Sequence, residues 1–189
     1  TNPGLSGSIA DPVHLSGATA VAVSGSFAYT TAAFAGRVAA MDISNPASPV
    51  FAGQTAMASS LLNASTINVA NGYAYVVSRN RNGPKGSNAN DDGTGNSLTI
   101  VDIHTTPAQP TIVGHLTDAA NLFGAYGIAV SGKFAYVTAQ GCLSSQPCPN
   151  PTAGNSFAVV DVSNPAQPHL VTTLHNGSLP AQWAGTNAL

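Results

Sequence analysis

A nine-residue segment occurs three times in this chain, and this repetition constrains the fold more than any other feature. The copies are 21–29 (VAVSGSFAY), 67–75 (INVANGYAY) and 128–136 (IAVSGKFAY). In each copy, apolar residues alternate with small or polar ones on both sides of a turn dipeptide, which is Ser-Gly or Asn-Gly. Alternation around such a dipeptide is typical of a β-hairpin. The sequence therefore predicts three related hairpins.

A second pair of strands is expected after each hairpin. An apolar run that ends near an aspartate leads into a turn with two prolines, and another short apolar run follows. Four-stranded units repeated in series are typical of β-propeller blades. The expected strands are 18–24, 27–33, 36–43, 49–54, 65–70, 73–78, 97–103, 110–115, 125–131, 134–139, 156–162 and 168–174. We therefore expect an all-β fold, a partial β-propeller of about three four-stranded blades.

The third strand of each unit resembles the motif that gives the LVIVD-repeat family its name. Residues 98–102 read LTIVD, and 157–161 (FAVVD) and 38–42 (VAAMD) are looser copies. The Ala-Tyr pairs and the turns with two prolines match as well, so the resemblance covers nearly the whole chain. It implies a β-propeller of bacterial or archaeal surface and secreted proteins. The family has no general catalytic motif, and the resemblance therefore implies no active site.

The two ends of the chain resemble parts of further blades. Residues 2–9 look like the last strand of a preceding blade, and 179–189 look like the approach to a new first strand. The expected divisions are 1–14 (end of a preceding blade), 15–55 (blade 1), 56–116 (blade 2), 117–174 (blade 3) and 175–189 (start of a following blade). With part-blades at both termini, residues 1–189 alone are not expected to be a well-behaved monomer, because the outer blade faces need neighbours.

Composition limits the partners. Charged residues make up 6 % of the 189 residues, against about 25 % in an average globular protein. The five Lys and Arg residues form no basic stripe, so nucleic acid is not an expected partner. No apolar run approaches the roughly 20 residues of a transmembrane helix, so we expect no membrane span in this segment.

Two cysteines, Cys142 and Cys148, lie close together in a Pro- and Ser-rich stretch without a CxxC pattern. A local pair in a chain of low charge predicts a disulfide that closes a surface loop. The disulfide would place the protein in an oxidising compartment: extracellular, on the cell surface or in the periplasm. Two free thiols are the alternative, and the mass of the intact protein with and without reductant distinguishes them.

The connection between the second and third strands is much longer in the second and third units than in the first. Long connections on a rigid frame are where binding residues gather. The longer stretch at 79–97 contains oxygen-bearing side chains at alternate positions, and a calcium ion held by Asn88, Asn90, Asp92 and Asn96 is one hypothesis. The stretch departs from an EF-hand because Thr99 stands where a bidentate Glu is needed and no helices flank it. A solvated Asn/Gly loop is the alternative.

Three aspartates recur at the ends of the third strands: Asp42, Asp102 and Asp161. A carboxylate just before a turn accepts hydrogen bonds from the turn backbone, so we predict a structural role for them rather than a ring of catalytic carboxylates. The recurring tyrosines Tyr29, Tyr75 and Tyr136 are expected to pack between blades, with carbohydrate stacking as the alternative. The histidines show no metal-ligand spacing and are predicted to be scattered over the surface; they are His14, His104, His115, His169 and His175.

These observations favour a non-enzymatic extracellular or cell-surface scaffold for interaction or adhesion, without a cofactor other than the calcium considered above. Its expected partners are proteins or further copies of the repeat that pack against the open blade edges, and surface glycans. One alternative is an accessory segment of a secreted enzyme or redox complex whose active site lies elsewhere. Another is a structural repeat unit of a surface layer or filament.

Overall fold

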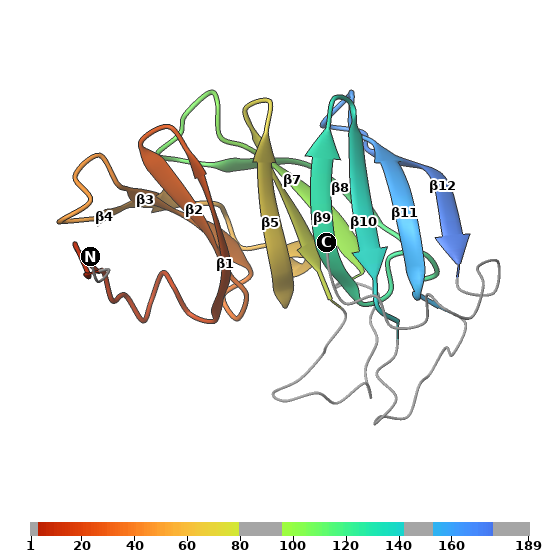
Figure 1. Ribbon diagram of the computed structural model, residues 1–189, viewed down its shortest axis with the longest axis horizontal. Coiled ribbons are helices and arrows are strands. Elements are labelled where there is room, and N and C mark those ends of the chain that lie inside the picture. The colour runs from red at the N-terminus through yellow and green to blue at the C-terminus, as the bar shows by residue number, and fades with distance from the viewer. Residues whose placement is uncertain (1–3, 80–95, 142–152, 176–189) are drawn as a thin grey trace.

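The computed structural model describes residues 4–79, 96–141 and 153–175, which form three four-stranded antiparallel sheets. Within each sheet the strands lie in chain order, and the sheets follow one another as blades 1, 2 and 3 (Figure 1). Blade 1 contains β1 (Ala18–Ser24), β2 (Phe27–Ala32), β3 (Arg37–Asp42) and β4 (Val50–Gln54). Blade 2 contains β5 (Ala64–Ala70), β6 (Tyr73–Ser78), β7 (Ser97–Asp102) and β8 (Thr111–Thr117). Blade 3 contains β9 (Ala125–Ser131), β10 (Phe134–Ala139), β11 (Ser156–Asp161) and β12 (His169–His175).

All twelve predicted strands are confirmed, with boundaries that differ from the prediction by at most two residues. The predicted hairpins are present, but the two-residue turns of blades 1 and 3 are Gly25-Ser26 and Gly132-Lys133 rather than Ser-Gly, because Ser24 and Ser131 pair within the strands. The first turn residue of each hairpin has positive φ: Gly25 (57°), Asn71 (53°) and Gly132 (58°). Only Gly and, less readily, Asn adopt this conformation at low cost. A helical turn, η1 (Ser59–Leu61), was not predicted. Among the described residues, no helix has the length and apolar character needed to cross a bilayer.

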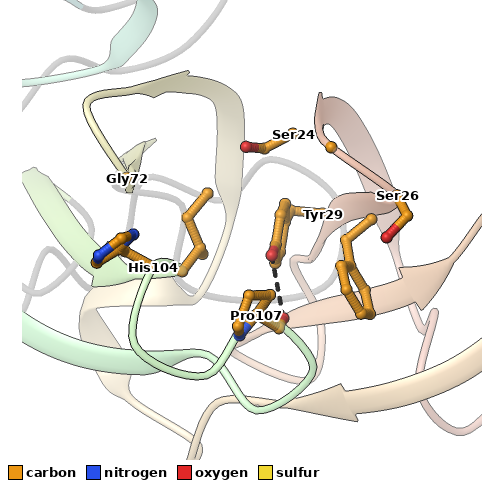
Figure 2. A pocket seen from close by; sticks show the side chains of 9 residues that line it. Ser24, Ser26, Tyr29, Gly72, His104 and Pro107 are labelled. Carbon is orange, nitrogen blue, oxygen red and sulfur yellow. Dashed lines mark hydrogen bonds between the residues drawn. The ribbon is translucent and has the colours of Figure 1, made fainter.

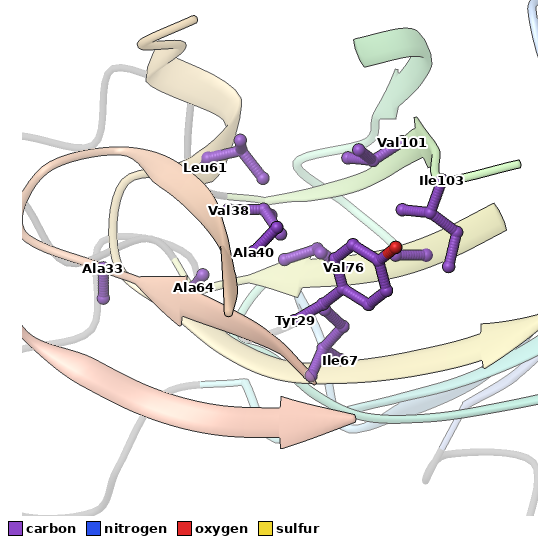
Figure 3. Close-up of a cluster of buried hydrophobic side chains, with 11 residues drawn as sticks. Tyr29, Ala33, Val38, Ala40, Leu61, Ala64, Ile67, Val76, Val101 and Ile103 are labelled. Atoms are coloured by element: carbon purple, nitrogen blue, oxygen red, sulfur yellow. The ribbon is translucent and has the colours of Figure 1, made fainter. Parts of the chain in front are cut away.

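The apolar core lies between the blades rather than within a single sheet. One cluster joins blade 1 to blade 2 and contains Tyr29 and Val38 of blade 1 with Ile67, Val76 and Val101 of blade 2 (Figure 3). Successive side chains of a strand point to opposite faces of the sheet, and apolar residues on both faces of blade 2 contact a neighbouring blade. Burial of these faces is the main favourable contribution to folding.

The second cluster joins blade 2 to blade 3 and repeats the pattern. Tyr75, Leu98 and Ile100 of blade 2 face Val137 and Val160 of blade 3. The predicted role of the recurring tyrosines is thus confirmed for Tyr29 and Tyr75, which are 0 % and 2 % exposed. Burial raises the pKa of both hydroxyls.

Hydroxyl groups hold the first strands of successive blades together. Thr19 of β1 donates to the carbonyl of Ala64 in β5 at 2.7 Å, and Ser65 of β5 donates to the carbonyl of Ala125 in β9 at 2.8 Å. The two bonds are repeat-equivalent, because Thr19 and Ser65 occupy the same position in their units. The equivalent residue of blade 3 is Tyr126, which has no short hydroxyl.

The outer strands of the three blades share a register shift at one equivalent position. Gly53 occupies this position in blade 1, Gly114 in blade 2 and Thr172 in blade 3. A Cβ atom on Gly53 would overlap the carbonyl oxygen of Ala108, and one on Gly114 would overlap that of Pro165. Glycine is therefore required wherever the turn of the following blade packs against this strand.

The segment before β1 contacts blade 1 in the same way. A Cβ atom on Gly7 would overlap the carbonyl oxygen of Pro46, which lies in the turn of blade 1 equivalent to the turns that contact Gly53 and Gly114. Farther along the segment, the ring of His14 stacks on that of Phe51, with centroids 3.8 Å apart. Residues around Gly7 thus pack against the turn of blade 1 as the outer strands of blades 1 and 2 pack against the turn of the following blade.

Candidate functional site

Because neighbouring strands are antiparallel, the connections between them lie at two opposite ends of the blades (Figure 1). The turn end contains the tight hairpin turns and the turns that follow Asp42, Asp102 and Asp161. The loop end contains the β2–β3, β6–β7 and β10–β11 connections and the linkers between blades. The two longer connections noted in the sequence therefore begin and end at the same end of the molecule.

The roots of the β6–β7 connection are hydrogen-bonded to one half-buried carbonyl group. The carbonyl of Ser60, in η1, accepts hydrogen bonds from the hydroxyls of Ser78, Ser97 and Thr99 at 2.7, 3.0 and 3.3 Å. These hydroxyls belong to the last residue of β6 and to β7, so the strands on both sides of the connection are fixed to the linker. Hydrogen bonding of all these buried groups makes the root rigid.

The predicted calcium ligands and the predicted disulfide fall mostly outside the described residues. Asn88, Asn90, Asp92, Cys142 and Cys148 lie there. Asn96 is described: it is fully buried immediately before β7, and its carbonyl accepts the backbone N–H of Asp118 at 3.0 Å. Calcium binding and the Cys142–Cys148 bond therefore stay predictions.

A stacked pair of side chains joins blades 2 and 3 at the loop end. The guanidinium carbon of Arg79 lies 3.7 Å from the centroid of the Tyr126 ring, a cation–π geometry. Arg79 follows β6, and its backbone N–H donates to the carbonyl of Asn63 at 3.1 Å. Tyr126 remains 39 % exposed, although the equivalent positions of blades 1 and 2 hold the small residues Thr19 and Ser65. Blade 3 therefore has a partly exposed aromatic ring at the position where blades 1 and 2 have a hydroxyl bonded to the following blade.

Large apolar side chains are also exposed in the connections at this end. Phe34, between β2 and β3, is 75 % exposed, and Met57, between β4 and β5, is 61 % exposed. Backbone hydrogen bonds hold their segments together, since Ala58 donates to the carbonyl of Gly36 at 3.0 Å and Asn63 to that of Ala33 at 3.0 Å. The loop end thus presents an aromatic ring, a thioether and an Arg–Tyr pair on fixed connections.

The predicted structural role of the recurring aspartates is confirmed at the turn end. Asp42 accepts the backbone N–H of Ser44 at 2.8 Å, and Asp161 accepts that of Ser163 at 2.8 Å. The hydroxyl and the backbone N–H of the serine lower the pKa of each carboxyl below its ordinary value of 3.8. For Asp102, burial acts to raise the pKa, but hydrogen bonds, led by the Thr105 hydroxyl, outweigh it and lower the pKa.

These shifts predict a loss of stability in acid. A carboxyl whose pKa is lower in the folded state stabilises the fold above its unfolded pKa of about 3.8, and the contribution disappears as pH falls through the folded value. The midpoint temperature of thermal unfolding is therefore expected to decrease when the pH is lowered below about 4. Asp102→Asn should make this decrease smaller. Carbon-13 titration of the carboxyl groups measures the pKa values directly. Values at or above 3.8 for Asp42, Asp102 and Asp161 would contradict the turn-acceptor role.

The histidines do not converge on a metal site in the part of the chain that the structure describes. His14 contacts Asp11 through Nδ1 at 2.6 Å, and Nε2 of His175 lies 2.9 Å from Oδ1 of Asn121. Two histidines thus make local polar contacts rather than lying isolated on the surface. The Arg79–Tyr126 pair was missed by the sequence analysis. Its signal was the large residue at position 126, where the other two units have small hydroxyl residues.

Known proteins show the same architecture. A periplasmic gluconolactonase from Pseudomonas aeruginosa superposes with a TM-score of 0.61 at 16 % identity, over 87 % of this chain and 41 % of that one. A putative 6-phosphogluconolactonase from Bacteroides fragilis superposes with a TM-score of 0.60 at 13 % identity, over 85 % of this chain and 40 % of that one. At such identities the likeness shows the fold alone, and this chain spans about two fifths of each structure. Among curated proteins, none matches the chain.

The family model for the LVIVD repeat matches residues 17–56, 93–118, 124–143 and 152–175. These segments include most of the twelve strands and more than half of the chain. The described residues form three packed blades of a β-propeller. The chain belongs to the LVIVD repeat family.

Proposed function

We propose that this segment is a non-enzymatic scaffold of an extracellular, cell-surface or periplasmic protein, and that it binds a protein partner through its loop end. The observation that carries the proposal is the exposed Tyr126 ring stacked on Arg79, at a position where blades 1 and 2 use small residues to hold neighbouring blades together. Tyr and Arg dominate the energetic centres of protein interfaces. Phe34 and Met57 add exposed apolar surface of the kind that interfaces bury.

The rigidity of the frame supports the same role. A fixed frame lowers the entropy cost of ordering a binding surface, and here the connections start from buried hydrogen-bonded roots around the Ser60 carbonyl. An oxidising location fits the predicted Cys142–Cys148 bond. The calcium proposed from the sequence would bind in the β6–β7 connection, which begins at Arg79.

The faces of blades 1 and 3 that point away from blade 2 form the second proposed interaction surface. Val21 of blade 1 is 62 % exposed, whereas its equivalent Ile67 is 6 % exposed because blade 1 covers it. Further copies of the repeat are the partner expected here, since they carry the matching face. The isolated chain is therefore expected to self-associate in sedimentation experiments, and Val21→Asp should reduce the association. A concentration-independent monomer would contradict this part of the proposal.

The experiment for the loop end compares Tyr126→Ser with the parent chain on an array of purified extracellular proteins. We expect saturable binding to at least one protein, and binding about thirtyfold weaker for Tyr126→Ser, the loss expected of a central interface residue. The thermal midpoint should fall by only about 2–4 °C, because the stacking of Arg79 on a half-exposed ring contributes about 0.5–1 kcal/mol. Val171→Ser is the matched control, since Val171 is 51 % exposed but lies on β12, away from the loop end.

The alternatives predict different results. Equal binding by the parent chain and Tyr126→Ser would contradict the loop-end interface and favour a structural repeat unit. The two similar solved structures are named as lactonases, so glucono-δ-lactone is the substrate to test for the enzymatic alternative. Hydrolysis above the rate without protein would contradict the non-enzymatic role.

A further inference from the structure

A pocket of about 270 Å³ opens at the turn end between blades 1 and 2 (Figure 2). Its blade 1 side is formed by the first hairpin, with Ser24 and Ser26, and by Tyr29. Its blade 2 side is formed by Gly72, His104 and Pro107. The Tyr29 hydroxyl lies at the centre and donates to the carbonyl of Pro107 at 3.0 Å, which fixes the two blades on either side of the opening.

The repeat is imperfect at the interface where this pocket opens. Between blades 2 and 3, the side-chain amide of Asn71 reaches across and donates to the carbonyl of Gly132 at 3.1 Å. The residue equivalent to Asn71 in the first hairpin is Gly25, and a Cβ atom placed there would meet nothing within 4 Å. The bridge that spans the second interface is therefore missing at the first.

A second departure places a ring beside this opening. His104 follows Asp102 by two residues, and serine stands at the equivalent positions 44 and 163. Within the described residues, no hydrogen bond to the imidazole of His104 or to the hydroxyls of Ser24 and Ser26 is formed by another protein group. Ser26 and His104 are exposed and Ser24 is half-buried, so these three polar side chains at the pocket are available to a ligand.

The lining chemistry restricts the ligand. None of the lining residues is Asp, Glu, Lys or Arg, so a charged ligand would lose its hydration without meeting an opposite charge. Phe27, Ile103 and Pro107 provide apolar surface beside the polar groups. The volume is just below the range of drug-sized pockets, so it suits a single ring rather than a chain.

We propose that this pocket binds one neutral pyranose ring, such as the terminal unit of a glycan. The C–H face of the sugar would lie on the apolar side formed by Phe27 and Pro107. Its hydroxyls would bond to Ser24, Ser26 and His104, and the oxygen of the Tyr29 hydroxyl can still accept a bond. The site lies at the end opposite Tyr126 and does not depend on the protein interface proposed above.

The test is a heteronuclear NMR titration of the 189-residue chain with the methyl glycosides of glucose, galactose, mannose and N-acetylglucosamine. A ligand of this size in a shallow pocket is expected to bind with a dissociation constant of about 1 mM. At least one glycoside should shift the amide signals of Ser24, Ser26 and His104 in a saturable way. Methyl glucuronide, an anionic sugar of the same size, should bind at least tenfold more weakly than the neutral ligand.

The plugged variant is designed to fill the opening of the pocket with an asparagine side chain. It combines Gly25→Asn with Ser26→Gly and so copies the native Asn71-Gly72 turn. Both residues of that native turn have positive φ (53° and 81°), so the change uses a conformation that the chain already adopts. Binding should fall at least tenfold. The matched control is Gly132→Asn with Lys133→Gly, which makes the same change in the third hairpin, away from the pocket, and should bind as the parent does.

His104→Ser is an independent second variant, because it restores the residue of the other two units without altering the hairpin. It should also weaken binding at least tenfold. No saturable shift with any of the four glycosides up to about 50 mM, far above the expected dissociation constant, would overturn the proposal. Unchanged binding by both the plugged variant and His104→Ser, or equal binding of the glucuronide, would overturn it as well.

Discussion

Replacing Gly114 by threonine is expected to lower the free energy of unfolding by about 3 kcal/mol, at the upper end of the cost of overpacking. The new Cβ atom would overlap the carbonyl oxygen of Pro165, which belongs to the turn of the next blade. Backbone cannot rotate aside as a flexible side chain can, so blade 3 would have to move away from blade 2. Urea unfolding followed by circular dichroism measures the change.

The chain contains its own control for this prediction. Thr172 occupies the equivalent position in blade 3, where it is exposed. Thr172→Val should therefore change the free energy of unfolding by no more than about 0.5 kcal/mol, as surface substitutions usually do. If Gly114→Thr changed the free energy of unfolding as little as Thr172→Val does, the close contact between the outer strand and the turn of the next blade would not exist.

The second large effect is expected for Leu98→Ala, which removes a side chain that is 0 % exposed between blades 2 and 3. Leucine-to-alanine changes at such sites cost about 2–5 kcal/mol, because the transfer free energy is lost and a cavity remains. The same substitution at Leu174, which is 48 % exposed on β12, removes the same atoms and should cost less than about 1 kcal/mol. Similar losses at the two positions would place the core elsewhere.

Most of the fold was predictable because its determinants are local. A turn dipeptide such as Asn71-Gly72 marks the reversal of the chain, and alternation on either side assigns the strands. The structural role of the recurring aspartates was equally predictable, since Asp42 and its hydrogen-bond partner Ser44 are two residues apart. Repetition added confirmation, because a pattern that occurs three times rarely arises from local accident.

The sequence did not predict the features that depend on contacts between two blades. Gly53 and Gly114 stand in the sequence as ordinary strand glycines, and their need for glycine comes from a turn about fifty residues farther along the chain. The same holds for Arg79 and Tyr126, which are brought together only when blades 2 and 3 pack. The pocket beside His104 is lined by Gly25, which has no side chain to bridge to the next blade, and this difference shows only by comparison with the bridge made by Asn71.

The central claim is that the three sheets pack face to face in chain order, with blade 2 between the others. Methyl-selective nuclear Overhauser spectroscopy of the 189-residue chain tests it most directly. Contacts are expected between the methyls of Val38 and those of Ile67 or Val76, and between those of Leu98 and Val137 or Val160, because each set belongs to one buried cluster. Contacts of Val38 with Val137 or Val160, together with none between Val38 and Ile67 or Val76, would mean that blade 1 packs on blade 3 and would contradict the propeller arrangement.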